Sequence, residues 1–187
     1  MAASHDGVST GFDWVYDARL HVGATAWFVF AERGYNPYWN INTSEHIPPL
    51  ISVFDTGAPI NPYPSISGTH NGTITPNKII EVSKLYTYPC AGTGGHTEYA
   101  RIYNDSWSIE TLPWEGYGGD WHNLSFTEPF KLYANVEYKF TIITGSYPQI
   151  HHRKTLPTEN GWINCTEFVD ANGNKYDDWI PAIMLWS

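Results

Sequence analysis

Apolar and polar residues alternate along the C-terminal two thirds of the chain, and this alternation predicts β-strands. In the segment VEYKFTI at 136–142 every second residue is apolar. Successive side chains of a strand point to opposite faces, so this pattern is typical of a strand with one buried and one solvated face. Similar runs, separated by turn residues, lie at 79–88, 97–103, 121–126, 130–133, 136–144, 162–169 and 175–185. About seven strands without an intervening helix predict a mainly β domain, an antiparallel β-sandwich or jelly roll, over residues 72–187.

The N-terminal third has a different pattern. Residues 15–33 predict a helix, because Gly34 is placed to cap its end and Pro37 prevents continuation. Its apolar residues cover most of the helix circumference, and such a helix is normally buried on nearly all sides. These residues are Val15, Leu20, Val22, Ala26, Trp27, Phe28, Val29 and Phe30. We therefore expect a helical segment at 1–35 that packs against the sandwich or another subunit, followed by a Pro/Gly-rich connector at 36–71 with one strand near 50–54.

Composition and charge narrow the classes of protein and partner. With 187 residues, 16% aromatic residues, 16% charged residues, 16 Gly and 13 Pro, the chain fits one β-rich domain with an appendage. A formal charge of -9 with only ten Lys and Arg argues against nucleic-acid and anionic-membrane partners, which are bound through clustered positive charge. The first eleven residues lack the basic start and apolar core of a signal peptide. No apolar run approaches the roughly 20 residues of a transmembrane helix.

Glycosylation motifs and cysteines favour an extracellular or cell-surface location. Chance would give roughly two Asn-x-Ser/Thr motifs in a chain of this composition. The chain has five, at Asn42, Asn71, Asn104, Asn123 and Asn164. Cys90 and Cys165 could close a long loop as a disulfide, contributing on the order of 4 kcal/mol in an oxidising compartment. The alternative is a pair of buried free thiols.

Pairs of acidic residues and histidines at strand spacing are the candidate chemistry. Residues i and i+2 of a strand share a face, so each pair can direct both side chains at one spot. If the three segments concerned are neighbours, their N and O ligands converge on a divalent cation or a polar ligand, and zinc is favoured over calcium. The residues are His96, Glu98, Asp120, His122, His151 and His152. The alternative is that these side chains alternate on solvated sheet faces.

Aromatic residues near these pairs suggest a second kind of site. A sugar ring could stack on an exposed aromatic platform, although packing in a β-sandwich explains the same residues equally well. The candidates are Trp107, Trp114, Tyr117 and Trp121. The segment 170–178 superficially matches a calcium loop, but its Gly stands at position four and Pro181 at position twelve. Asn172-Gly173 instead predicts a hairpin with a type I′ turn.

Several segments, taken in order, resemble a known module. They are KLYTYPCAGTGGHTEYARIYN, GDWHNLSF, YKFTIITGSYPQIHH and GWINCTEFVDANGNKYDDWIPAIMLW. Over about 74–186 they resemble a β-sandwich module near the C-termini of uncharacterised archaeal extracellular proteins. The resemblance implies an extracellular location, and that relatives share the segments carrying the acid and histidine pairs. The segment FDWVYDARLHVGATAWFVFAERGYNPYW is similar to the last helix of an α/α-toroid of glycosidases and lyases; nearly all of such a toroid is missing, which implies no glycosidase activity for this chain alone.

Together these patterns predict a secreted or cell-surface binding or adhesion module, and not an enzyme. We expect its ligand to be a carbohydrate or a cell-surface protein, with a divalent metal held by the acid and histidine pairs. One alternative is a structural subunit of an extracellular polymer that self-assembles through the N-terminal helix. A further alternative is a metal-dependent hydrolase, although no general base is found outside the metal cluster.

Overall fold

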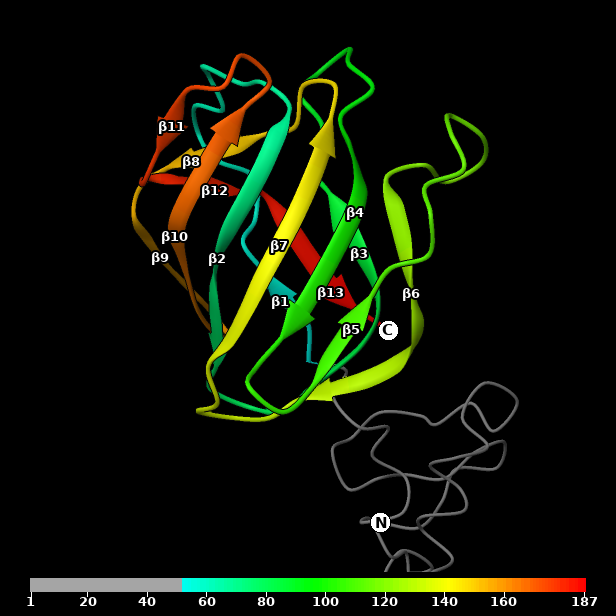
Figure 1. Cartoon of the computed structure of the whole chain (residues 1–187), viewed down its shortest axis with the longest axis vertical. Helices are drawn as coiled ribbons and strands as arrows, with labels where there is room; N and C mark the ends of the chain where they lie inside the picture. Colours follow the sequence, from blue (N-terminus) through cyan, green and yellow to red (C-terminus); the bar gives the residue numbers. More distant parts are fainter. Residues whose placement is uncertain (1–51) are drawn as a thin grey trace, which may run out of the picture. The chain divides into compact units, whose positions relative to one another are not determined.

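Residues 52–187, which the computed structural model describes, consist of strands joined by turns and loops (Figure 1). The strands are β1 (Phe54–Asp55), β2 (Gly68–Pro76), β3 (Ile80–Thr87), β4 (His96–Tyr103), β5 (Ser108–Glu110), β6 (Asn123–Leu132), β7 (Tyr138–Gly145), β8 (Ile150–His152), β9 (Thr155–Thr158), β10 (Gly161–Asp170), β11 (Lys175–Tyr176), β12 (Trp179–Pro181) and β13 (Ile183–Trp186). The mainly β prediction is confirmed for this part of the chain. The helix predicted at 15–33 lies outside the described residues. No helix with the length and hydropathy needed to cross a bilayer occurs in residues 52–187.

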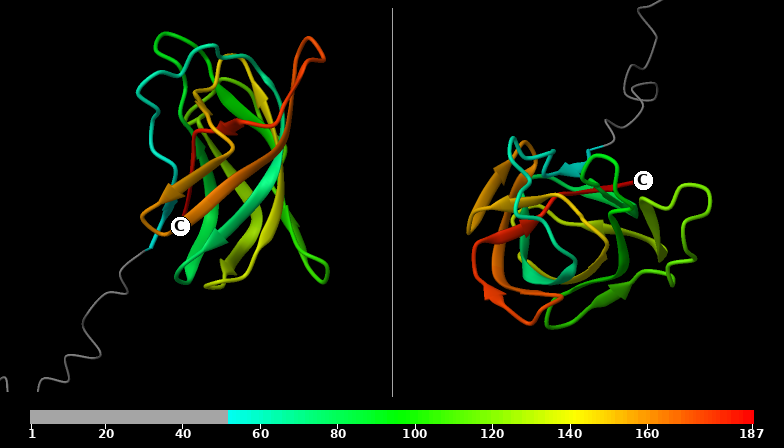
Figure 2. Two further views of the ribbon diagram at one scale, coloured as in Figure 1. Left: turned by 90° about the vertical axis from the view of Figure 1, so that its left-hand side faces the viewer. Right: turned by 90° about the horizontal axis from the view of Figure 1, so that it is seen from above.

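All strand pairs are antiparallel and form two larger sheets and one small one. One sheet has the order β1-β13-β3-β6, and the other has the order β11-β10-β2-β7-β4-β5 with β9 also on β10. β8 and β12 pair with each other. The views in Figure 2 show the larger sheets facing one another. One apolar cluster joins them, because it includes Val82 and Leu185 from the first sheet and Ile74, Phe140 and Ile163 from the second.

The strand β7 shows how the alternation of the sequence forms this core. Tyr138, Phe140 and Ile142 are buried, while Lys139 between them is exposed. The strand is central, between β2 and β4. Its inward side chains therefore contact both sheets, as the pattern of polar and apolar positions predicted.

The strand β2 was not predicted, because its inward positions include His70 and Gly72 beside the apolar Ile74. Gly72 is required there by packing: a Cβ atom would overlap the carbonyl oxygen of Asn164 and the Phe140 ring. β1 and the start of β2 also lie within the predicted connector. The β-rich region therefore begins earlier in the chain than expected, with residues near Phe54 pairing to β13.

Other differences concern strand continuity. The runs predicted at 121–126 and 130–133 belong to one strand, β6, which bends where its pairing with β3 shifts register. The single run predicted at 175–185 is divided into β11, β12 and β13. The short strands β5, β8 and β9 have too few residues for a visible alternation.

The hairpin predicted at Asn172-Gly173 is present between β10 and β11. Its turn is not type I′, because that turn needs positive φ at both central residues and only Gly173 has it, at 85°. The Asp170 carboxylate organises the turn instead by accepting hydrogen bonds from the backbone N–H groups of Asn172 and Asn174, at 2.8 and 2.9 Å. The Asn174 side-chain amide, which donates to the same carboxylate at 3.0 Å, is the main reason that the pKa of Asp170 lies below its usual value, and the two backbone bonds add to it.

Candidate ligand-binding site

The loop formed by residues 112–122 connects β5 to β6 and projects from the edge of the seven-stranded sheet (Figure 1). Its two ends lie side by side, because Thr111 forms a bridge with Phe126 and the Leu112 N–H donates to the Ser125 carbonyl at 2.8 Å. Gly116 and Gly119 have φ values of 93° and 59°, which favour glycine. The loop therefore starts and finishes on paired backbone and turns sharply in between.

Stacked rings hold this loop against β4. His96 is only 2% exposed, and its ring stacks on Trp114 with centroids 3.7 Å apart. Tyr117 meets Trp114 edge to face at 5.0 Å and Trp121 at 6.1 Å. The Trp114 Nε1–H donates to the Trp121 carbonyl at 3.4 Å. We call His96, Trp114, Tyr117 and Trp121 the aromatic cluster. Such ring pairs contribute about 0.5–1.5 kcal/mol each beyond burial.

Backbone carbonyls fix the histidine rings of this region. The Nδ1 of His96 donates to the Gly94 carbonyl at 2.6 Å, and the Nδ1 of His122 donates to the Gly95 carbonyl at 2.9 Å. A carbonyl can only accept, so Nδ1 carries the proton in both rings. The His96 Nε2 lies 3.4 Å from a Glu98 carboxylate oxygen, but has no hydrogen-bond partner in the described part of the chain. His96 thus anchors the loop through Trp114 and Gly94.

The structure does not bring His96, Glu98, Asp120, His122 and at least one of His151 and His152 together in one pocket, since Asp120 lines one cavity and the histidine pair lines another. No group of three or more His, Cys, Asp or Glu residues within 52–187 is placed to hold a metal ion. His96, Glu98 and His122 come near one another. Asp120 instead accepts from the Asn123 amide at 2.7 Å.

The two remaining histidines lie elsewhere. His151 and His152 are on β8, where the Nε2 of His151 donates to the Gly57 carbonyl at 2.9 Å and His152 contacts Trp179. The first pair does meet despite a register shift in β4, since the His96 Nε2 lies 3.4 Å from the Glu98 carboxylate. The second pair is not in a strand, because Asp120 and His122 both precede the first residue of β6. The i, i+2 rule holds only inside a regular strand.

A glycine on the neighbouring strand makes room for His96. A Cβ atom on Gly145 would overlap the His96 ring and the Glu98 carboxylate. We expect Gly145→Ala to displace both side chains, release Trp114 and lower the free energy of unfolding by about 1–3 kcal/mol, as overpacking does. Urea denaturation followed by tryptophan fluorescence measures this. Gly118→Ala is the control, because a Cβ there meets open space; equal stability of the two variants would contradict the packing account.

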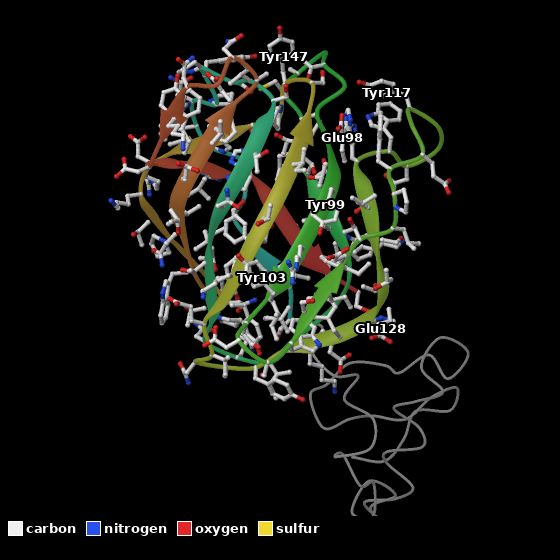
Figure 3. All side chains as sticks on the ribbon, viewed as in Figure 1. Glu98, Tyr99, Tyr103, Tyr117, Glu128 and Tyr147 are labelled. Carbon is white, nitrogen blue, oxygen red and sulfur yellow. The ribbon has the colours of Figure 1, made fainter. Side chains whose placement is uncertain are left out.

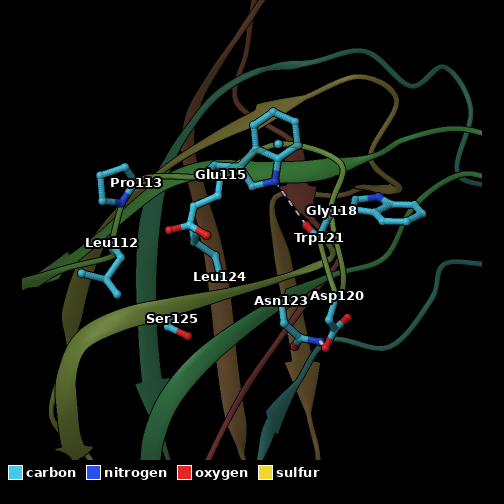
Figure 4. A pocket seen from close by; sticks show the side chains of 11 residues that line it. Leu112, Pro113, Glu115, Gly118, Asp120, Trp121, Asn123, Leu124 and Ser125 are labelled. Carbon is cyan, nitrogen blue, oxygen red and sulfur yellow. Dashed lines mark hydrogen bonds between the residues drawn. The ribbon is translucent and has the colours of Figure 1, made fainter.

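A cavity of about 230 Å³ lies between the loop and β6 (Figure 4). Its lining comprises Leu112, Pro113, Trp114, Glu115, Gly116, Gly118, Asp120, Trp121, Asn123, Leu124 and Ser125. In Figure 4 the carboxylates of Glu115 and Asp120 lie on different sides of the group of lining residues. The side chains of Glu115 and Ser125 have no hydrogen-bond partner within residues 52–187, whereas the Asn123 amide is held between Asp120 and Trp186. The sequence interpretation missed Glu115 and Ser125, since neither belongs to a recognisable motif.

The predicted aromatic platform is brought together only in part. Trp114, Tyr117 and Trp121 share the loop, and Tyr117 is 61% exposed. Trp107 packs instead against Phe130 and Tyr138, with ring centroids 5.3 and 6.1 Å away. Packing within the sandwich therefore explains Trp107, whereas the loop residues present an accessible aromatic edge on which a sugar ring could stack.

The predicted disulfide is not formed, and Cys90 and Cys165 are both buried free thiols. Cys165 pairs with Gly72, which pairs with Phe140 on β7, whereas the Cys90 N–H bonds to Tyr147 beyond the far end of that strand. Strands rise about 3.3 Å per residue, so this offset far exceeds the roughly 7 Å Cα separation that a disulfide allows. Burial raises the pKa of the Cys165 thiol, which keeps it protonated and unreactive.

The predicted glycosylation positions differ in how their amides are held. The Nδ2 atoms of Asn123 and Asn164 donate to Asp120 and Thr73, at 2.7 and 3.1 Å. The Asn71 Oδ1 accepts from Thr141, and the Asn104 Oδ1 accepts from the Ser106 N–H in an exposed turn. Asn42 lies outside the described residues. Glycosylation at these positions stays a prediction.

Comparisons of the chain with protein-family models, with curated proteins and with solved structures gave no match.

Proposed function

We propose that residues 52–187 form a β-sandwich module that binds neutral carbohydrate outside the cell or at its surface. The observation that carries this proposal is the cavity beside the loop 112–122, with unengaged polar groups next to an exposed aromatic edge. Ligand sites in proteins combine such a concave surface with a few polar groups that orient the ligand. A cavity of about 230 Å³ is of the order of one sugar ring.

The polar groups of the cavity suit hydroxyl groups. The carboxylates of Glu115 and Asp120 can each accept hydrogen bonds, and the Ser125 hydroxyl can donate and accept. Tyr117 adds an exposed ring at the rim of the loop. Because the lining contains two carboxylates and no Lys or Arg, an acidic sugar would be repelled. The ligand class that fits is therefore a neutral sugar.

The extracellular setting is part of the proposal. Its support is the excess of Asn-x-Ser/Thr motifs. Two facing antiparallel sheets that present a loop at one edge support the sandwich assignment and a binding role.

Binding to a panel of neutral oligosaccharides immobilised on an array tests the proposal. We expect Glu115→Ala to weaken binding to the preferred oligosaccharide about tenfold or more, because a hydrogen bond to a charged acceptor is lost. Tyr117→Ala should weaken it as well. Their controls are Glu128→Ala, at an exposed position of β6 outside the cavity, and Tyr147→Ala, which is 55% exposed (Figure 3).

The controls should bind like the unsubstituted protein. The proposal fails if no oligosaccharide of the panel binds, or if Glu128→Ala and Tyr147→Ala reduce binding as much as the loop variants do. Thermal melting of each variant shows whether a loss of binding reflects a loss of fold.

A further inference from the structure

A second cavity, of about 350 Å³, lies at the opposite edge of the seven-stranded sheet, where β9 pairs with β10. The loop after β1 forms one wall, and β8 with the start of β9 forms the other. Its lining is Ala58, Pro59, Ile60, Asn61, His151, His152, Arg153 and Leu156. Unlike the first cavity, its lining includes no carboxylate.

Hydrogen-bond donors without partners gather in this cavity. The Arg153 guanidinium has no ion pair or hydrogen bond within residues 52–187. The His152 Nε2 is buried and has no hydrogen-bond partner in the same part of the chain. Within residues 52–187 Asn61 uses only its Oδ1, which accepts from the Tyr63 N–H at 3.1 Å, so its amide N–H groups have no partner in this part of the chain. Two side chains, Arg153 and Asn61, thus offer N–H groups to the hollow, and the His152 ring lines it.

The free arginine is unusual within this acidic protein. Arg101, Lys131, Lys139, Lys154 and Lys175 each lie within 4 Å of a carboxylate, and Lys84 lies over the Trp186 ring. Arg153 and Lys78 are the two cations of residues 52–187 left without either kind of partner. The nearby Asp55 lies outside the cavity lining, and its carboxylate accepts from the Tyr88 hydroxyl at 2.9 Å. No carboxylate within residues 52–187 therefore pairs with Arg153.

The rest of the lining is apolar. Pro59, Ile60 and Leu156 face the same hollow, and Ile60 is fully exposed. Burial lowers the pKa of His151, so its ring is neutral near pH 7, and it is engaged with Gly57. The cavity therefore combines one permanent positive charge and the Asn61 amide N–H groups with an apolar wall.

We propose that this cavity binds a small organic carboxylate, with Arg153 pairing to the carboxylate and the Asn61 amide donating a further hydrogen bond. Arginine matches a carboxylate with two parallel N–H groups. The apolar wall suits a compact carbon frame such as the ring of a uronic acid, which an inorganic anion lacks. This site does not depend on the carbohydrate site of the loop, because the two cavities share no residue.

Titration of the whole chain with sodium glucuronate, followed by amide chemical shifts in NMR, tests the proposal. We expect saturable shifts at residues 151–153 and 58–61, and much smaller shifts with neutral methyl glucoside and with sodium sulfate at matched ionic strength. Arg153→Gln should weaken glucuronate binding about tenfold or more, and Arg153→Lys should weaken it less, because the charge remains while the paired geometry is lost.

Lys78→Gln is the matched control, since it removes one unpaired positive charge away from the cavity and should leave glucuronate binding unchanged. The proposal is overturned if glucuronate causes no shifts at these residues, if Arg153→Gln binds as well as the unsubstituted protein, or if Lys78→Gln weakens binding equally. Sulfate binding that depends on Arg153 while glucuronate binding does not would also overturn it. Glu115→Ala should leave glucuronate binding intact, so the failure of one site is distinguishable from the failure of the other.

Discussion

Phe168→Ala is expected to lower the free energy of unfolding by about 3–5 kcal/mol, because it removes a fully buried aromatic ring from the core. The ring stacks on His70 with centroids 4.1 Å apart and on Trp179 at 5.5 Å. Trp179 in turn stacks on Tyr176 at 3.9 Å. Phe168 thus joins β2 and β10 to β12 and β11, and its loss leaves a cavity where these strands meet.

Urea denaturation of the variant and of the unsubstituted chain measures this difference. Val169→Ala is the control in the same strand, because Val169 is on the opposite face and only partly buried; its cost should be below about 1 kcal/mol. A loss below about 1 kcal/mol for Phe168→Ala would show that this part of the core is loosely packed.

Acidification is expected to destabilise the fold through His70. The His70 ring is buried, and burial lowers its pKa from 6.5 to about 3, although the Nδ1–H donates to the Trp179 carbonyl at 3.3 Å. The unfolded chain takes up a proton as the pH falls through about 6.5, whereas the folded protein does so only near 3. Stability should therefore fall as the pH decreases, by about 1.4 kcal/mol per pH unit between these values. Between pH 6.5 and 4.5 the loss amounts to about 2–3 kcal/mol.

His70→Phe isolates this contribution, because it keeps a ring against Phe168 and removes the titrating group. The free energy of unfolding, measured from pH 7 to pH 4.5, should fall more steeply with decreasing pH in the unsubstituted protein than in the variant if His70 is responsible. The pKa of His151 is also lowered by burial, so a smaller slope of the same sign should persist in the variant. Parallel slopes in the two proteins would contradict the assignment to His70.

The strands that the sequence predicts well are those with regular alternation in the middle of a sheet. The inward residues of β7 are mostly apolar and alternate with polar ones. β3, β4 and β10 contain similar alternating stretches, so the approximate bounds of these strands were predictable. β2 pairs with both β7 and β10, yet its inward positions include His70 and Gly72. Gly72 is there because the Phe140 ring leaves no room for a side chain, and His70 is there because its ring stacks on Phe168. Both reasons are tertiary contacts, which the local sequence does not reveal.

The candidate site was predictable only in part for a related reason. The sequence identified Trp114, Tyr117 and Trp121, which share a short loop, and His96, which lies beneath them. It assigned His96 to a metal because spacing along a strand does not reveal that the ring stacks on Trp114 and bonds to the Gly94 carbonyl. His151 and His152 were grouped with the others although β8 pairs only with β12, a connection that no local pattern encodes.

The closed neck of the loop 112–122 has a consequence for how such a protein diversifies. Because the pairing of Thr111 with Phe126 and the stacking of Trp114 on His96 fix the base of the loop, the exposed residues of its outer turn can be exchanged without altering the path of the chain out of β5 or into β6. Gly118 stands in open space, so the outermost turn can accept larger side chains or added residues. The sheets and the outer turn of the loop can therefore evolve separately. Mutations in the outer turn can change which ligand is bound, while the sheets and their core stay the same.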